Sequence, residues 1–189
     1  DTWFRDPAVY SFFDRQVDDA FFEDFDRVLF YGAGMSGYAA CAYAVAAPGA
    51  QVLALNPRAT LDPQQAGWDN RTRPARRLDF TSRYGYAPDM LEGVAKATVV
   101  HDTTLPADAM HAALFRAPYI TRLSARHLGD GLELHFTQMA ILNPMIEAAM
   151  KMGTAVAMLL LVAACKPAAD KAAVGDDTVD APSMPAAKA

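Results

Sequence analysis

The sequence is poor in the residues that build disulfide-bonded or metal-binding domains. Its 189 residues include two cysteines, Cys41 and Cys165, and four histidines. No Cys or His lies at the spacing of a zinc site, and one distant pair of cysteines does not make a disulfide framework. We therefore expect neither a disulfide nor a structural metal, and no bound cofactor.

The sequence also lacks a basic stripe and an N-terminal hydrophobic run. Its formal net charge is −5, and acidic and basic residues are mixed along most of its length. Because phosphate backbones attract basic stripes, we expect no nucleic-acid partner. The chain starts at Asp1 with an aromatic, acidic segment that is not a signal peptide. We expect a cytoplasmic domain that lacks its true N-terminus.

Residues 27–56 alternate between strand and helix patterns. Residues 27–31 and 51–55 are short apolar runs, and the alanine-rich segment 38–47 lies between them. A strand, a helix and a strand within this length make a βαβ unit with a right-handed crossover. The remaining pattern predicts helices near 12–26, 108–115 and 137–150, strands at 97–101 and 119–125, and a long loop over 57–88. We therefore predict a parallel α/β domain.

The C-terminal segment differs from the rest of the chain. Residues 150–165 have a basic start, an apolar stretch and small residues before Cys165. This segment resembles a bacterial lipoprotein signal with its lipobox, and the tail 166–189 has too little apolar surface to order itself. Such a signal works at an N-terminus, so its place favours a chimera in which a second reading frame follows a truncated first one. Lipidation of Cys165 would then attach the chain to a membrane.

Two other interpretations of this segment stay open. Residues 152–164 could extend the closing helix into the core, because they are shorter than the roughly 20 residues needed to span a bilayer. A C-terminal membrane anchor is the third alternative.

The glycine-rich turn after the first strand has two interpretations. In the first, Gly32, Gly34 and Gly37 form a dinucleotide fingerprint that lets the backbone approach a pyrophosphate at the helix N-terminus. The second strand then ends at Asn56 and Arg58, where a ribose-binding acid is expected. Arg58 suits the extra phosphate of NADP instead. This interpretation predicts a Rossmann domain of an oxidoreductase that binds NAD(P) or FAD.

In the second interpretation the same turn is a nucleophile elbow, as in G-x-S-x-G. Residues 30–40, together with the apolar strand that ends at Pro57, resemble α/β-hydrolase-like proteins of bacterial glycan and secretion loci, over roughly residues 12–149. Aligned with that pattern, the nucleophile position falls on Gly34, which has no side chain for acyl transfer. Ser36, two positions later, is the alternative nucleophile.

The same resemblance implies an acid and a base downstream, in the chain order nucleophile, acid, base. Asp102 and Asp108 are the candidate acids, and the family's spacing favours Asp108. His135 is the candidate base, and His111 and His127 compete with it. An Asp that starts a helix is more often an N-cap than a catalytic acid, and a lone His near a strand end is more often a hydrogen-bonded or surface residue.

The loop over 57–88 carries the one basic cluster, interleaved with aromatic side chains. Its arginines suit phosphate, sulfate or carboxylate groups. The favoured alternative is a solvated loop whose arginines pair with Asp69, Asp79 and Asp89. The arginines of the cluster are Arg71, Arg73, Arg76, Arg77 and Arg83.

We therefore predict a three-layer, α/β-hydrolase-like domain over 1–149, truncated before its elbow strand, then the signal-like segment 150–165 and a disordered tail 166–189. The predicted function is that of a pseudohydrolase that binds a small-molecule or glycan-type ligand or serves as a scaffold. If it is active, it is a serine-type hydrolase or esterase. The alternatives are the NAD(P)- or FAD-binding domain and a membrane-tethered lipoprotein.

Overall fold

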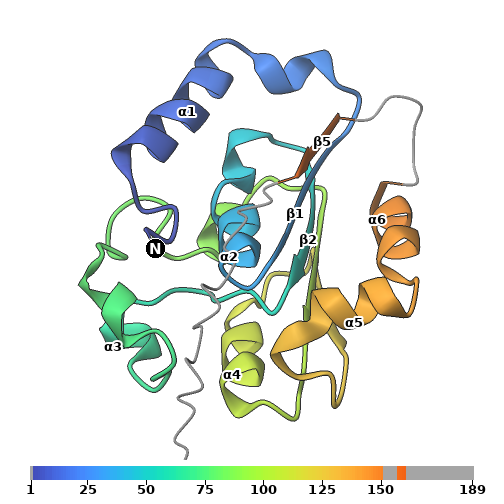
Figure 1. Ribbon diagram of the computed structural model, residues 1–189. Helices are drawn as coiled ribbons and strands as arrows, with labels where there is room; N and C mark the ends of the chain where they lie inside the picture. Colours follow the sequence, from blue (N-terminus) through green and yellow to red (C-terminus); the bar gives the residue numbers. More distant parts are fainter. Residues whose placement is uncertain (1, 151–156, 161–189) are drawn as a thin grey trace, which may run out of the picture.

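A parallel β-sheet forms the centre of the computed structural model, which describes residues 2–150 and 157–160 (Figure 1). The strand order is β4-β3-β2-β1-β5, and every neighbouring pair is parallel. The prediction of a parallel α/β domain is thus confirmed. The strands are β1 (Val28–Ala33), β2 (Gln51–Leu55), β3 (Lys96–His101), β4 (Ile120–Ser124) and β5 (Ala157–Leu160).

Helices cover both faces of the sheet. Asp6 caps α1 with its side chain, and Asp62 caps α3 in the same way, each directly before a proline at the first helical position. The α-helices are α1 (Pro7–Asp18), α2 (Met35–Ala42), α3 (Pro63–Ala66), α4 (Pro106–Leu114), α5 (Leu132–Gln138) and α6 (Leu142–Met150). Short 3-10 helices are η1 (Phe21–Asp24), η2 (Ala44–Ala46), η3 (Arg73–Arg77), η4 (Asp89–Leu91) and η5 (Gly129–Gly131).

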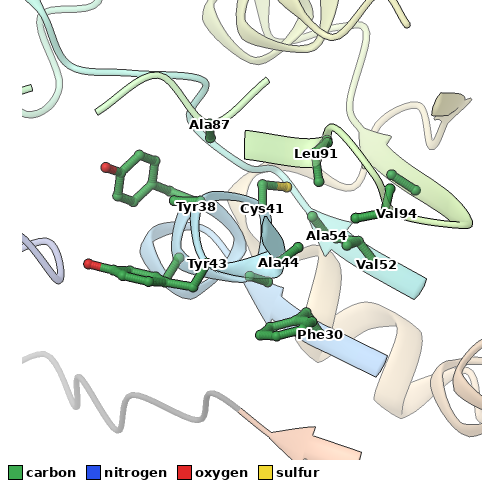
Figure 2. Packing of buried hydrophobic residues seen from close by; sticks show 14 of the residues in the cluster. Phe30, Tyr38, Cys41, Tyr43, Ala44, Val52, Ala54, Ala87, Leu91 and Val94 are labelled. Carbon is green, nitrogen blue, oxygen red and sulfur yellow. The ribbon is translucent and has the colours of Figure 1, made fainter. Parts of the chain in front are cut away.

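Helix α2 lies at the centre of the larger core (Figure 2). Its residues from Gly37 to Ala42 are all buried, as expected for a helix that is apolar on every side. Small alanines let it approach the sheet, where Phe30 and Val52 face it. Tyr43 stacks on Phe13 of α1 with ring centroids 4.3 Å apart. This packing holds the N-terminal end of α2, and with it the glycine-rich turn, against β1 and β2.

Helices α5 and α6 pack on the opposite face of the sheet. Leu29, Leu53 and Leu55 from the strands meet Leu132 and Phe136 of α5 there. The hydroxyl of Tyr31 in β1 donates a 2.6 Å hydrogen bond to Glu133 of α5. The predicted three-layer arrangement is therefore present in the described residues.

Two of the predicted helices are interrupted. The closing helix over 137–150 divides into α5 and α6 at Ala140, which has a φ of 56°. The N-terminal helix ends at Asp18, and Ala20 with a φ of 52° separates it from η1. A left-handed backbone ends a helix, and alanine in that conformation has no sequence signature.

The C-terminal predictions fall mostly outside the described residues. Residues 157–160 form β5, which pairs with Val28–Tyr31 of β1, so a helix extending through 152–164 is wrong for this stretch. Cys165 and the tail 166–189 lie outside the described residues, and with them the lipoprotein and disorder predictions. Among the described residues, none of the helices has both the length and the apolar composition to cross a bilayer.

The long segment between β2 and β3 packs along the core. Tyr38 of α2 donates a 2.6 Å hydrogen bond to the carbonyl of Tyr84. Arg5 is buried and its guanidinium donates to the carbonyls of Asp79 and Arg83. The segment is therefore fixed by buried polar contacts from the N-terminal half of the chain.

Candidate functional site

The turn between β1 and α2, residues 32–37, is called the elbow turn here. Gly34 lies at its apex with φ 58° and ψ −114°, as the residue that caps α2. Its N–H donates a 2.8 Å hydrogen bond to the carbonyl of Leu55, at the carboxyl end of β2. A Cβ atom on Gly34 would meet nothing within 4 Å. The apex therefore faces open space at the carboxyl edge of the sheet.

The other two glycines of the turn are needed for packing. A Cβ on Gly32 would collide with the carbonyl of Ser36, and one on Gly37 would lie 3.0 Å from the carbonyl of Leu55. Each glycine thus lets α2 approach the strands. A sharp strand–helix turn explains both positions without a bound nucleotide.

Ser36 lies in the first turn of α2, behind the apex, and is half-buried. A nucleophile at this position would need a base within hydrogen-bond reach. Among the described residues, its hydroxyl has no hydrogen bond to a histidine or a carboxylate.

Asp102 follows β3 and is fully buried, but its carboxylate is already occupied. Oδ1 accepts from the N–H and hydroxyl of Thr104, at 2.7 and 2.6 Å. Oδ2 accepts from the N–H groups of Leu128 and Gly129, at 2.7 and 2.8 Å. Burial would raise the pKa of Asp102, but these hydrogen bonds outweigh it and hold the pKa well below its usual range. Asp102 therefore fastens the loop after β4 to the loop after β3.

The predicted bases lie apart from this carboxylate. His135 lies inside α5, and a Cβ on Gly131 would contact its ring at 3.6 Å. His127 is exposed in the loop after β4 and has a φ of 65°. In the described part of the chain neither imidazole has a hydrogen bond to Asp102 or Asp108. The structure does not assemble the triad that the resemblance implies.

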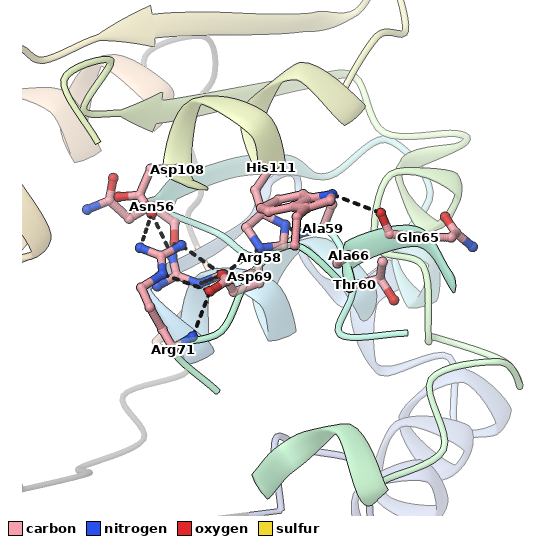
Figure 3. A network of polar contacts seen from close by, with 12 residues as sticks. Asn56, Arg58, Ala59, Thr60, Gln65, Ala66, Asp69, Arg71, Asp108 and His111 are labelled. Carbon is pink, nitrogen blue, oxygen red and sulfur yellow. Dashed lines mark hydrogen bonds and ion pairs between the residues drawn. The ribbon is translucent and has the colours of Figure 1, made fainter. Parts of the chain in front are cut away.

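Asp108 instead belongs to a buried group of charged residues, the arginine–aspartate cluster: Arg58, Asp69, Arg71, Asp108 and His111 (Figure 3). Arg71 reaches Asp69 at 2.8 Å and Asp108 at 2.6 Å. Arg58 reaches Asp108 at 3.1 Å and Asp69 at 3.5 Å. Each guanidinium thus faces both carboxylates, and the four charges balance.

Chain segments far apart in the sequence supply the cluster. Arg58 follows β2, Asp69 and Arg71 come from the loop after α3, and Asp108 and His111 from α4. Asp108 lies in the first turn of α4, where the helix dipole favours a carboxylate, but Leu105 is the N-cap. The predicted N-cap role is therefore wrong for Asp108. Its carboxylate joins α4 to the long loop.

His111 is held in one tautomer. Its Nδ1 accepts a hydrogen bond from the N–H of Ala59 at 3.2 Å, so the proton lies on Nε2 and points to Asp69 at 3.0 Å. Trp68 packs over the ring with centroids 4.6 Å apart. Both ring nitrogens are occupied, so His111 is a structural residue and not a free general base.

Burial sets the charge states within the cluster. Burial lowers the pKa of His111 to about 4; the hydrogen bond to Asp69 opposes this shift, and Arg58 adds to it. Burial would raise the pKa of Asp69, but hydrogen bonds from Arg71 and His111 hold the pKa well below its usual range. Neutral His111 and ionised Asp69 therefore face Arg58 and Arg71 at neutral pH.

Two buried acceptors beside the cluster are not satisfied. Asp108 Oδ2 and Asn56 Oδ1 have no hydrogen-bond partner within residues 2–150 and 157–160. Asn56 ends β2 and adjoins the elbow turn through the Gly34–Leu55 hydrogen bond; its amide donates to the carbonyl of Gly129. Buried acceptors are usually paired, so these two suit a donor such as a hydroxyl group or a water.

The loop arginines divide between the two expectations. Arg71 pairs with Asp69, as predicted, but Asp69 is buried and not solvated. Arg83 pairs with Asp14 of α1, and Arg76 donates to backbone carbonyls, including that of Asp69. Arg58, offered for the NADP phosphate, is committed to two carboxylates. These arginines serve internal contacts.

No family model, curated protein or solved structure matches the chain in the comparisons. Within the described ranges, no group of three or more His, Cys, Asp or Glu side chains is arranged to hold a metal ion. The elbow turn and the arginine–aspartate cluster are therefore the features from which a function is inferred.

Folding stability should fall as the pH drops from about 6.5 to about 4, because His111 stays neutral in the folded protein while the unfolded chain takes up a proton. The folded pKa is depressed, so the contribution is complete above the unfolded pKa and is lost with acid. The expected loss is on the order of 3 kcal/mol. Urea unfolding followed by circular dichroism across this range measures it.

A His111→Gln variant is the control for this prediction. It should be less stable at pH 7 and should have a shallower pH dependence between 4 and 6.5. The remaining slope is assigned to His101, whose pKa burial and Arg122 also lower, and near pH 4 to Asp69 and Asp102, whose lowered pKa values make stability fall with acid. A variant with the same slope as the parent would show that His111 is not the titrating group.

Proposed function

We propose that the protein is a catalytically inactive α/β-hydrolase-like protein that binds a small-molecule or glycan-type ligand at the elbow turn. The observation that carries the proposal is the apex residue. Gly34 occupies a sharp strand–helix turn with φ 58° and ψ −114°, open space lies beyond it, and it has no side chain to attack a carbonyl.

The sheet order supports this assignment over a dinucleotide-binding domain. In a Rossmann sheet the second and third strands lie on one side of the first, and the fourth to sixth strands lie on its other side, in the order 3-2-1-4-5-6. Here β4 continues beyond β3, and only β5 lies on the other side of β1. The strands β1 to β4 are thus neighbours in chain order across the sheet, starting from the strand that leads into the elbow turn. The same order places Asp102 and then the loop after β4 downstream of the elbow.

The occupied carboxylate of Asp102 supports an inactive site. A triad acid has to orient the imidazole of a histidine, and Asp102 accepts four hydrogen bonds from Thr104, Leu128 and Gly129 instead. His135 lies inside α5, and both nitrogens of His111 are occupied. Within the described residues, neither histidine is therefore oriented by Asp102 as a triad base would be.

The unsatisfied acceptors indicate the chemistry of the ligand. Asn56 Oδ1 and Asp108 Oδ2 are buried near the carboxyl ends of the strands, and each lacks a donor within the described residues. A molecule rich in hydroxyl groups supplies such donors without introducing a charge into the balanced cluster. This favours a polyol or sugar over a phosphate ester.

Three measurements on one panel of proteins test the proposal. The parent, Gly34→Ser and Ser36→Ala are compared for labelling by a fluorophosphonate, hydrolysis of p-nitrophenyl acetate, and calorimetric titration with NADPH and FAD. We expect no labelling, hydrolysis at the buffer rate and no cofactor binding in the parent and in both variants, because within the described residues no histidine is hydrogen-bonded to Asp102 or to Ser36 as an activated base would be.

Each alternative has its own signature in this panel. Labelling of the parent that disappears in Ser36→Ala would make Ser36 a nucleophile and the protein an esterase. Labelling of Gly34→Ser alone would reveal an intact base and a lost nucleophile, against the reading of Asp102 given above. Stoichiometric NADPH or FAD binding would replace the proposal with the dinucleotide-binding alternative.

A further inference from the structure

A groove of about 560 Å³ extends along one face of the sheet, from the amino ends of β1, β2 and β3 to Leu123 near the carboxyl end of β4. Its floor is the face of the sheet that α5 and α6 cover only in part. The register places Leu53, Thr98 and Thr121 in one row across β2, β3 and β4. Leu53 is buried, while Thr121 and Leu123 of the edge strand β4 are exposed. The sheet is therefore uncovered towards β4.

Helix α6 forms the opposite wall of the groove. Met145, Ala148 and Ala149 line it, and Leu123 faces them from β4. Leu123 is 43% exposed. Small alanines on α6 leave the space open. The walls thus offer a mainly apolar slot of the size that binds small molecules.

The charged side chains of the groove all have one sign. Arg27 precedes β1 and Lys96 begins β3, and both line the groove at its amino-terminal end. Arg27 is anchored by a 3.1 Å hydrogen bond from its Nη1 to the carbonyl of Met150, and Lys96 is exposed. None of the described lining residues is acidic. The whole chain has a net charge of −5, whereas the charged residues that line this groove are both positive.

We propose that this groove binds the single chain of an anionic amphiphile, such as a fatty acid. The acyl chain lies between the sheet face at Leu53 and Leu123 and the α6 wall at Met145 and Ala148. The carboxylate lies at the rim, within reach of Lys96 and Arg27. Apolar burial supplies the affinity, and the two cations set the direction of the chain and select an acid over a neutral molecule.

Calorimetric titration of the full chain with decanoate, and with 1-decanol as the neutral control, tests the proposal. We expect one decanoate per chain, with weaker binding of the alcohol. Lys96→Glu should weaken decanoate about three- to tenfold and leave decanol unchanged, because it replaces an attractive charge with a repulsive one at the rim. Raised salt should weaken the acid alone.

Two further variants separate the groove from nonspecific binding. Ala148→Trp fills the slot from an exposed position of α6 and should abolish binding of both compounds, with an unchanged circular dichroism spectrum. Arg126→Glu makes the same charge change outside the groove and should bind decanoate like the parent. These outcomes are independent of the elbow turn, so they do not depend on the function proposed above.

Several results would overturn the proposal. These are absent decanoate binding, equal loss in Lys96→Glu and Arg126→Glu, or binding that survives Ala148→Trp. Sedimentation of the parent and of Ala148→Trp adds a fourth. A parent dimer that Ala148→Trp dissociates, without decanoate binding, would identify a second copy of the chain as the occupant.

Discussion

Replacing Asp69 with Ala should destabilise the protein by about 3–5 kcal/mol, because it removes one carboxylate from a buried, balanced set of charges. Asp69 receives hydrogen bonds from Arg71 and His111 and lies 3.5 Å from the Nε of Arg58. Without it, Asp108 is the one buried carboxylate left to neutralise Arg58, whose side chain is 11% exposed, and Arg71, whose side chain is 31% exposed. The free energy of unfolding in urea at pH 7.5 measures the loss.

Two controls locate the origin of this effect. Asp130 lies 3.6 Å from Arg71 but its side chain is 75% exposed, so Asp130→Ala should change stability by less than about 0.5 kcal/mol. Asp69→Asn keeps the shape and part of the hydrogen bonding but not the charge. We expect Asp69→Asn to lower the free energy of unfolding by more than half as much as Asp69→Ala does. A loss below about 1 kcal/mol for Asp69→Ala would mean that solvent reaches the cluster and compensates the arginines.

The strands are the part of the fold that the sequence predicts best. β2 coincides with the predicted run 51–55, and the ends of β1, β3 and β4 lie within two residues of their predicted positions. β1 and β2 are buried in the parallel sheet, so their residues form nearly continuous apolar runs between polar loops, whereas β4 is an exposed edge strand. Helix ends are less predictable, because Ala20 and Ala140 take left-handed backbone angles with an ordinary helix-forming residue.

The arginine–aspartate cluster could not be assembled from the sequence in the same way. The pair of Arg71 with Asp69 is local and was expected, whereas His111 is 42 residues from Asp69 and Asp108 is 37 residues from Arg71. Proximity across such separations depends on where α4 and the loop after β2 meet. A polar pattern in the sequence does not distinguish a solvated loop from a buried network, since both use Arg and Asp.

For the candidate triad, the sequence predicts the order of the residues along the chain but not their hydrogen-bond partners. The resemblance orders Gly34, Asp102 or Asp108, and His135 along the chain, and it predicts the elbow turn at which Gly34 is found. It does not predict which hydrogen bonds each carboxylate accepts. The Oδ2 atom of Asp102 accepts hydrogen bonds from backbone N–H groups of the loop after β4, and no sequence pattern marks these donors.

The glycines of the elbow turn should differ in their response to alanine. Gly32→Ala should cost about 3 kcal/mol, because its Cβ would collide with the backbone of Ser36, which moves only if α2 leaves β1. Gly34→Ala should cost less, about 2 kcal/mol, because nothing lies within 4 Å of its Cβ but φ 58° with ψ −114° lies outside the left-handed region that other residues adopt. Thermal and urea unfolding of both variants measure the difference.

Gly93 provides the matched control for backbone strain. It has a φ of 89° and open space at its Cβ, but it lies at the other end of the sheet, where its carbonyl accepts from Gly49. Gly93→Ala and Gly34→Ala should therefore both cost less than Gly32→Ala, because neither new Cβ meets another atom within 4 Å. If Gly34→Ala instead approaches the cost of Gly32→Ala, the apex is not open, and neither a ligand nor an introduced serine side chain could occupy the space above it. A small cost leaves Gly34→Ser as a folded protein, in which the absence of fluorophosphonate labelling reports on chemistry and not on misfolding.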